Sequence, residues 1–341
     1  MYTFFIKPIL FLFEPEKAHN IAFFLFKLIY KIPYISKLLN KSFCIDDDRL
    51  KRKLFGIDFK NPVGLAAGFD KNAEVFNEFS DFGFGFIEIG TVTPIAQSGN
   101  PKPRLFRLKK DSAIINRMGF NNDGVETIVN RLKNKYKDII IGGNIGKNKN
   151  TSNEKAVDDY LFSFERIAPY VDYLVLNVSS PNTPGLIKLQ EEEYLSNLLK
   201  RVQKLNFGKF NKPILVKISP DLSFVQIDKV LDLIKKYKVS GIIATNTTSK
   251  RKNLSIGNEK INKIGNGGLS GQPLFNKSLE IVSYIRSKNA SLPIVAVGGI
   301  SSPEKALQIM NAGASLIQIY TSFIYSGPSI VKKINSKLLI S

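Results

Sequence analysis

Eight short apolar segments, most of them followed by a helical pattern, constrain the fold of this chain more than any other feature. From Leu54 onward they lie at 62–69, 84–92, 138–145, 172–178, 213–218, 240–246, 293–298 and 314–320. Amphipathic patterns at helical spacing lie between most of them, at 72–81, 122–136, 153–168, 191–204, 223–237, 274–288 and 303–311. Continuous apolar strands that alternate with helices are typical of an α/β fold with a buried parallel sheet.

Eight such units predict a closed (β/α)8 TIM barrel. The alternative is an open, doubly wound sheet, but no GxGxxG motif follows the first strand. Two long segments interrupt the alternation. Residues 94–118 are broken by prolines and predict a small hairpin of 104–107 with 113–115, and residues 248–273 are polar and rich in glycine. Long loops inside compact domains usually serve function.

Residues 1–45 differ from the rest of the chain. Short apolar, phenylalanine-rich runs are broken at Pro15 and Pro33 and are punctuated by lysines. None of the runs approaches the ~20 apolar residues of a membrane-spanning helix. The pattern predicts two or three amphipathic helices that lie in a membrane interface. The alternative is a helical hairpin packed on the main domain. We therefore divide the chain into an N-terminal helical part, 1–45, and a barrel, 46–341.

Composition narrows the classes of function. The net charge of +20 suits an anionic membrane surface or nucleic acid, or reflects lysines scattered over solvated faces. The sequence lacks a compact basic run or a nucleic-acid-binding motif, so we expect the membrane surface and no nucleic acid. The chain has one cysteine, Cys44, and one histidine, His19. These counts exclude an intramolecular disulfide and argue against a metal site or a Ser-His-Asp hydrolase.

Polar side chains gather where the predicted strands end, which is where barrel enzymes place their sites. Amides and hydroxyls are provided by Asn116, Asn144, Asn177, Asn182, Thr245, Asn246 and Thr247. Amides satisfy a heterocycle with alternating donors and acceptors, and the amines of Lys71 and Lys217 need anionic partners. Gly271, Gly298 and Gly299 allow backbone N–H groups to approach a phosphate. The sequence thus predicts a flavin with a small carboxylate substrate.

Six motifs, in this order, resemble those of the dihydroorotate dehydrogenase family. They are Ala67-Gly-Phe-Asp-Lys71, Asn116-Arg-Met-Gly-Phe120, Asn177-Val-Ser-Ser-Pro-Asn-Thr-Pro-Gly185, Ala244-Thr-Asn-Thr-Thr248, Gly267-Gly-Leu-Ser-Gly271 and Val297-Gly-Gly-Ile300. The resemblance covers nearly the whole chain. Ser180 stands at the position of the catalytic base, where one class of the family has cysteine. Together with the N-terminal helices, this serine resembles the membrane-associated, quinone-using class.

The resemblance implies a role for each matching residue. Ser180 removes the C5 proton of dihydroorotate while hydride passes from C6 to N5 of FMN, and a membrane quinone then accepts the electrons, in the pyrimidine (UMP) pathway. The implied substrate residues are Lys71, Asn116, Arg117, Met118, Gly119, Phe120, Asn177, Asn182, Asn246 and Thr247. The implied FMN residues are Ala67, Gly68, Phe69, Asp70, Lys71, Thr91, Asn144, Asn177, Lys217, Thr245, Gly271, Gly299, Tyr320 and Thr321. His19, Arg107 and Tyr320 match positions that line a quinone tunnel.

Two alternatives stay open at this point. Another FMN barrel, such as a tRNA dihydrouridine synthase, would suit the positive charge, but that family needs a catalytic cysteine and Cys44 precedes the barrel. A membrane-bound scaffold without activity would not need the set of amides and lysines. The chain begins with the apolar helices and has no Arg/Ser-rich presequence. We therefore expect a peripheral protein on the cytoplasmic face of a bacterial inner membrane.

Overall fold

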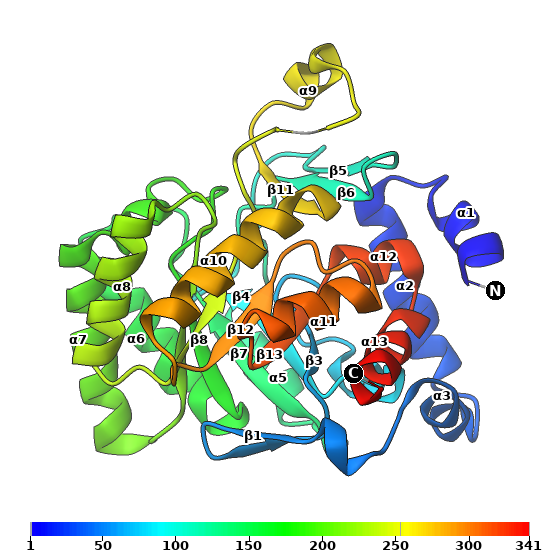
Figure 1. The fold of residues 1–341 in the computed structure, drawn as a ribbon, viewed down its shortest axis with the longest axis horizontal. Helices are drawn as coiled ribbons and strands as arrows, with labels where there is room; N and C mark the ends of the chain where they lie inside the picture. The colour runs from blue at the N-terminus through cyan, green and yellow to red at the C-terminus, as the bar shows by residue number, and fades with distance from the viewer. Residues whose placement is uncertain (1, 253, 341) are drawn as a thin grey trace.

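A closed barrel of eight parallel strands lies at the centre of the computed structural model, which describes residues 2–252 and 254–340 (Figure 1). Met1, Asn253 and Ser341, which the predicted divisions 1–45 and 46–341 include, lie outside the described residues. The strands are β3 (Val63–Leu65), β4 (Phe86–Val92), β7 (Ile140–Ile145), β8 (Tyr173–Asn177), β9 (Ile214–Ile218), β10 (Gly241–Ala244), β12 (Ile294–Val297) and β13 (Leu316–Ile319). Pairing of β13 with β3 closes the barrel. The predicted TIM barrel and its eight strands are confirmed.

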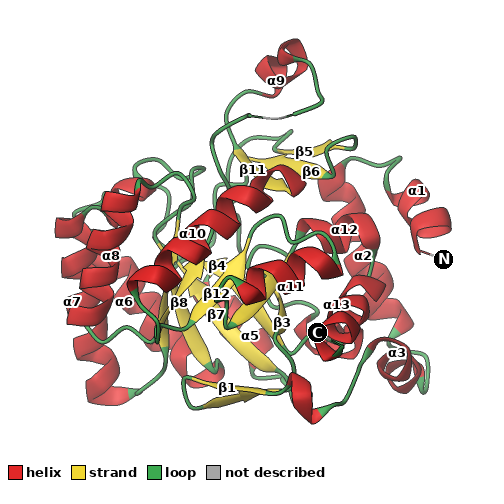
Figure 2. Cartoon of the chain, in the orientation of Figure 1, coloured by secondary structure: helices red, strands yellow, loops and turns green. Residues whose placement is uncertain are grey.

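Helices surround the barrel, as the sequence predicts (Figure 2). They are α4 (Phe76–Phe79), α5 (Val125–Leu132), α6 (Ala156–Ile167), α7 (Glu192–Lys209), α8 (Phe224–Lys236), α10 (Phe275–Lys288), α11 (Pro303–Asn311), α12 (Thr321–Ser326) and α13 (Ser329–Leu339). The helix predicted at 72–81 is wrong in its extent. The buried Asp70 carboxylate accepts the backbone N–H groups of Glu74 and Val75, and this cap holds residues 70–75 as a loop before α4.

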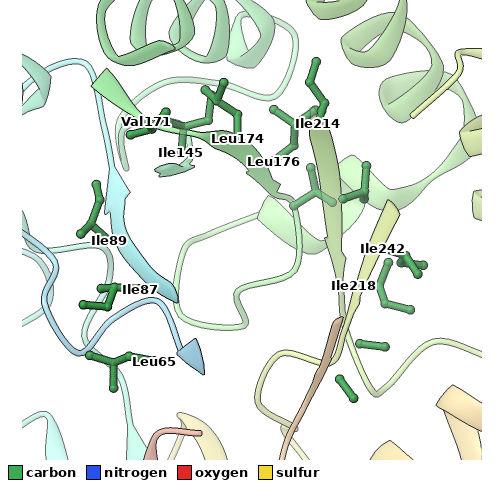
Figure 3. Packing of buried hydrophobic residues seen from close by; sticks show 14 of the residues in the cluster. Leu65, Ile87, Ile89, Ile145, Val171, Leu174, Leu176, Ile214, Ile218 and Ile242 are labelled. Carbon is green, nitrogen blue, oxygen red and sulfur yellow. The ribbon is translucent and has the colours of Figure 1, made fainter. Parts of the chain in front are cut away.

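Alternation along each strand separates an apolar outer layer from an interior that is apolar toward the N-terminal end of the barrel and polar toward the carboxyl ends of the strands. Leu174, Leu176 and Ile218 belong to the cluster between strands and helices, as Figure 3 shows. The intervening residues point into the barrel, because successive side chains of a strand face opposite sides. This parity places Glu88 of β4 and Lys217 of β9 inside the barrel, where they pair.

The N-terminal end of the barrel is filled by aromatic rings. A Cβ on Gly64 would lie 2.3 Å from the Phe86 ring, and one on Gly142 would lie 2.2 Å from the Tyr173 ring. These glycines make room for rings on the neighbouring strands. The hairpin of β1 (Arg52–Leu54) and β2 (Ile57–Phe59) packs beneath them, with the rings of Phe59 and Phe86 5.3 Å apart. The filled end leaves the opposite mouth for a ligand.

A three-stranded antiparallel sheet stands over that mouth. It contains β5 (Leu105–Leu108), β6 (Ala113–Asn116) and β11 (Gly268–Gly271), in the order β11-β6-β5. The hairpin predicted in 94–118 is confirmed as β5 and β6. The third strand comes from the second long segment, which also carries α9 (Asn258–Ile264), seen above β5 and β6 in Figure 1.

The N-terminal helices lie together beside α12 and α13 (Figure 1). A π-helical turn (Tyr2–Ile6) leads into α1 (Lys7–Leu10), α2 (Pro15–Ile29) and α3 (Ile35–Phe43). The buried Asp81 anchors them to the barrel, because it accepts hydrogen bonds from Tyr30, directly after α2, and from Ser36 of α3. In the described part of the chain, no helix has the length and apolarity needed to cross a membrane.

Candidate active site

A cavity of about 400 Å³ opens at the carboxyl ends of the barrel strands. Its volume falls in the range of ~300–1,000 Å³ that is typical of ligand pockets. Seven strands or the loops after them contribute Gly68, Thr91, Ser180, Lys217, Thr245, Gly298 and Tyr320 to the lining. The eighth strand, β7, contributes no residue to the lining, but its fully buried Asn144 lies behind it, bonded to the lining residues Thr91 and Asn177. The structure thus brings together residues that lie up to 252 positions apart in the sequence.

Four asparagines line this cavity in two hydrogen-bonded pairs, Asn177 with Asn246 and Asn116 with Asn182. Asn177 donates to Thr91 Oγ1 at 2.8 Å and to Asn144 Oδ1 at 3.2 Å. Asn246 donates to Ser179 Oγ at 2.9 Å and to Asn177 Oδ1 at 3.3 Å. These bonds fix the amides before any ligand arrives. The remaining donors and acceptors face the cavity and can read the edge of a planar heterocycle.

Ser180 lies beside a second asparagine pair. Asn182 Nδ2 donates to Asn116 Oδ1 at 3.0 Å, and the Asn182 backbone N–H donates to Ser180 Oγ at 3.3 Å. Ser180 is 6% exposed, so its hydroxyl sits in a site largely shielded from water. A hydroxyl becomes a useful base only where water is excluded and where nearby cations or donors stabilise its partial negative charge.

A buried charge pair lies deeper in the barrel. Glu88 is fully buried, accepts from Asn144 at 2.8 Å and from Gln318 at 2.6 Å, and has the Lys217 ammonium at 3.8 Å. Burial lowers the pKa of Lys217, and the Glu88 carboxylate opposes that shift. A buried amine beside a single carboxylate keeps donor capacity for an electron-rich ligand above it.

Lys71 supplies the second ammonium of the cavity. Its pKa is lowered from 10.5 to about 8, mainly by burial and also by the Arg104 charge, while the charges of Glu16 and Asp70 oppose this shift. An anionic ligand would favour the charged form. The cavity is therefore suited to an anion on this side.

Glycines form a cradle at the other side of the mouth. Gly271, Gly298 and Gly299 line the cavity with φ of 97°, 127° and 73°. A Cβ would lie 2.4 Å from a backbone atom at Gly271 and at Gly299. Side chains other than glycine would be strained there. The buried Ser322 Oγ also lines the cavity and has no hydrogen-bond partner among the described residues. The space, the N–H groups and this hydroxyl fit a phosphate.

Some residues of the predicted site lie outside the cavity lining. The Phe69 ring packs against Phe79 and Phe323, and the Asp70 carboxylate caps its own loop. Arg117 donates to the backbone oxygens of Ile264 and Pro103. Other lining residues were not predicted, among them Ser270, Gln318, Ser322 and Tyr325. Gln318 and Glu88 could have been found, because each is a polar residue inside an apolar strand segment.

Aromatic rings connect the cavity to the N-terminal helices. His19 of α2 lies 4.1 Å from the Phe23 ring and 5.4 Å from the Phe69 ring, and Phe69 lies 5.3 Å from Tyr320. Burial, together with the Lys71 charge and against the opposing charge of Glu16, lowers the pKa of His19 to about 3, so the imidazole is neutral at physiological pH. Arg107 donates to the backbone oxygens of Leu10 and Phe13 where α1 meets α2.

A family model for dihydroorotate dehydrogenase matches residues 49–340. The chain belongs to the dihydroorotate dehydrogenase family. The described residues hold no group of three or more His, Cys, Asp or Glu side chains placed to bind a metal.

Curated dihydroorotate dehydrogenases resemble the chain over nearly its full length. The "dihydroorotate dehydrogenase (quinone)" of Christiangramia forsetii is 53% identical over 99% of both chains. That of Gloeobacter violaceus is 48% identical over 97% of this chain and 92% of its own. A crystal structure of the DHODH of Eimeria tenella in complex with ferulenol has a TM-score of 0.85 at 38% identity, and the match covers 96% of this chain and 91% of that one.

Proposed function

We propose that this protein oxidises (S)-dihydroorotate to orotate, with FMN as the hydride acceptor and a membrane quinone as the final electron acceptor, in pyrimidine biosynthesis. One observation carries the proposal: the shielded Ser180 lines a cavity together with two asparagine pairs and Lys71. Relatives whose names state this reaction are 53% and 48% identical to the chain.

Ser180 would take the proton from C5 of the substrate. Neither the single histidine nor the single cysteine lines the cavity, so no stronger base of these types is available. Asn116, Asn177, Asn182, Asn246 and Thr247 would hold the pyrimidine ring by its edge. Lys71 would pair with the negative charge of the substrate and stabilise the charge that develops as the proton leaves.

The site fits FMN, which when bound would supply the acceptor for the hydride. The glycine cradle and the unpaired hydroxyl of Ser322 suit its phosphate, with Thr321 and Tyr320 beside them. Lys217 and Asn144 would face the ring system from the barrel interior, held there by Glu88. Thr91, Thr245, Ala67 and Gly68 complete the surroundings of the ring.

Residues 1–45 would form the quinone and membrane part of the protein, and 46–341 the FMN barrel. The exposed side chains of Phe4, Phe5, Leu12, Phe24 and Leu38 are each more than 60% exposed, although they are apolar. Lys17, Lys31 and Lys37 are interspersed among them and suit an anionic membrane surface. We place the protein on the cytoplasmic face of a bacterial inner membrane. Quinone would enter between these helices and reach the cavity past His19, Arg107 and Tyr320.

A stepwise anaerobic assay tests the proposal. Purified protein should be yellow, with one FMN per chain, and dihydroorotate should bleach its flavin absorbance. A short-chain quinone should then restore the absorbance faster than fumarate or NAD+ does. A colourless protein that cannot be reconstituted with FMN, or a flavin that dihydroorotate leaves oxidised, would refute the proposed activity. Reoxidation by fumarate or NAD+ in place of quinone would refute the proposed acceptor.

A further inference from the structure

The guanidinium of Arg104 connects the N-terminal helices, which the proposed function assigns to the quinone, with loops at the barrel mouth, which it assigns to the substrate. It lies in the loop before β5 and is 6% exposed. Nε and Nη2 donate to the two carboxylate oxygens of Glu16, in the first turn of α2, at 3.1 Å and 2.6 Å. Nη1 donates to the backbone oxygens of Ser98 at 2.5 Å and Asn100 at 2.9 Å. Such a bidentate, charge-assisted pair fixes both partners in distance and in orientation.

Asn100 continues the connection toward the substrate side. Its side-chain nitrogen donates to the backbone oxygens of Arg117 at 3.0 Å and Asn182 at 3.1 Å. The backbone N–H of Asn182 in turn donates to Ser180 Oγ at 3.3 Å. A continuous series of hydrogen bonds thus runs from the first turn of α2, through Arg104 and Asn100, to the loop that carries Ser180.

Two other anchors of α2 lead to no residue that lines the cavity. Lys27 pairs with Glu74 at 2.6 Å, with both side chains substantially exposed, and Tyr30 bonds to Asp81 at 3.1 Å. Neither Glu74 nor Asp81 lines the cavity. The Lys27–Glu74 pair therefore offers a matched comparison, since it is also an ion pair between α2 and the barrel.

Resting on the proposed function, we propose that Glu16 and Arg104 are positioning residues through which α2 holds the Ser180–Asn182 loop in its substrate-binding arrangement. His19 lies one turn after Glu16 on the same helix and contacts Phe69. The helix α2, which forms part of the proposed quinone entrance, would thus also order the Ser180–Asn182 loop when it is docked on the barrel. Coupling of this kind is reciprocal, so a ligand that stabilises the loop also stabilises the docked helix.

The test uses the FMN-loaded, full-length protein and separates the two half-reactions. Glu16→Gln and Arg104→Lys should each weaken orotate binding, measured by flavin spectral titration, at least tenfold. Both should slow anaerobic flavin reduction by dihydroorotate in the absence of quinone, with FMN still bound. Lys27→Gln should change neither value by more than twofold. The Glu16→Gln/Arg104→Lys double variant should lose no more orotate affinity than the single variant that binds orotate less tightly. Both substitutions break the same Glu16–Arg104 pair, so their effects should not add.

Asn100→Ala provides a second route to the same conclusion, since it leaves the ion pair in place and removes the next bond. It should also weaken orotate binding, while reoxidation of the reduced enzyme by quinone keeps its rate. Wild-type orotate affinity in Asn100→Ala, or in a folded Glu16→Gln variant, would overturn the inference and leave Glu16 as an anchor of α2 alone. Failure of the wild-type protein to react with dihydroorotate would instead refute the proposed function.

Discussion

The barrel mouth and the N-terminal helices distribute their polar and apolar groups in opposite ways. At the mouth, Asn177, Asn144 and Glu88 are buried and bonded to one another. In α2, only Ala18 and Phe23 are buried, and most of the large apolar side chains exposed in the described residues belong to positions 4–38. The mouth is thus prepared inside the protein for a polar ligand, whereas the exposed apolar side chains of the helices would be covered by the membrane in the proposed function.

The largest effect is expected at the barrel mouth, when the proposed base Ser180 is removed. Ser180→Ala should retain FMN and orotate but slow flavin reduction by dihydroorotate roughly 10²–10⁴-fold, the usual contribution of a general base. Stopped-flow absorbance gives the rate. Ser163→Ala, at a buried serine of α6 outside the cavity, is the control and should react like the wild type. Wild-type reduction by Ser180→Ala would remove Ser180 from the role of base.

The next largest effect is a difference in unfolding free energy between breaking an ion pair inside the barrel and breaking one between α2 and the barrel. Glu88→Gln places an amide nitrogen against donors of Asn144 or Gln318 and leaves Lys217 without its carboxylate. Breaking one partner of a buried pair costs about 3–5 kcal/mol of unfolding free energy. Glu74→Gln breaks the exposed Lys27–Glu74 pair, and such pairs contribute about 0–1 kcal/mol. Denaturant titration measures both variants.

The Glu88→Gln/Lys217→Met double variant is the control for that prediction. Because it removes both charges, it should recover much of the stability that Glu88→Gln loses. Equal losses in Glu88→Gln and Glu74→Gln would show that the barrel interior holds charge no more strictly than the surface does, and the proposed contrast between the two regions would fail.

On the apolar side, the exposed face of α2 can be altered without touching the cavity. Phe24 and Leu28 are 66% and 49% exposed and lie four residues apart on one face. Replacing both with serine should weaken binding to anionic liposomes roughly a hundredfold, since each large apolar side chain contributes about 1.5 kcal/mol or more when buried. Co-sedimentation measures this loss. Phe207→Ser, at an exposed site on α7, should bind like the wild type. Undiminished binding of the double variant would contradict a membrane role for this face.

The sequence predicted the parts of the fold that depend on local pattern. All eight barrel strands lie in mainly apolar segments, and each was found within a few residues of its bounds. The helix predicted at 72–81 failed, because the Asp70 side chain competes for the backbone N–H groups of its first turn. The strand Gly268–Gly271 has no apolar alternation and exists through its pairing with β6, about 150 residues away.

The candidate site divides in the same way. Residues that follow strands, such as Asn177 and Thr245, could be placed at the mouth from the topology alone. Ser322 and Tyr325 could not, because they reach the cavity from α12. The Glu16–Arg104 pair joins residues 88 positions apart and carries no local signal. Arg117, which the family motif assigns to the substrate, contacts backbone oxygens outside the cavity lining.

The smallest expected effect is a difference in pH dependence between the barrel mouth, where Lys71 titrates, and the N-terminal helices, where His19 lies. His19 of α2 has its pKa lowered to about 3, so the quinone side stays uncharged at this position from pH 6 to 9. Lys71 at the mouth has its pKa lowered to about 8, so it loses its charge as the pH rises through that range. Orotate carries a carboxylate and favours the charged form of Lys71. By linkage, its affinity should then fall by up to about tenfold per pH unit above pH 8 and stay level below it.

Calorimetric titration of the FMN-loaded protein measures this slope, which Lys71→Gln should flatten. The rate of reoxidation by quinone should show no step from His19 between pH 6 and 9. A slope in orotate affinity that survives Lys71→Gln would assign the titration to another group.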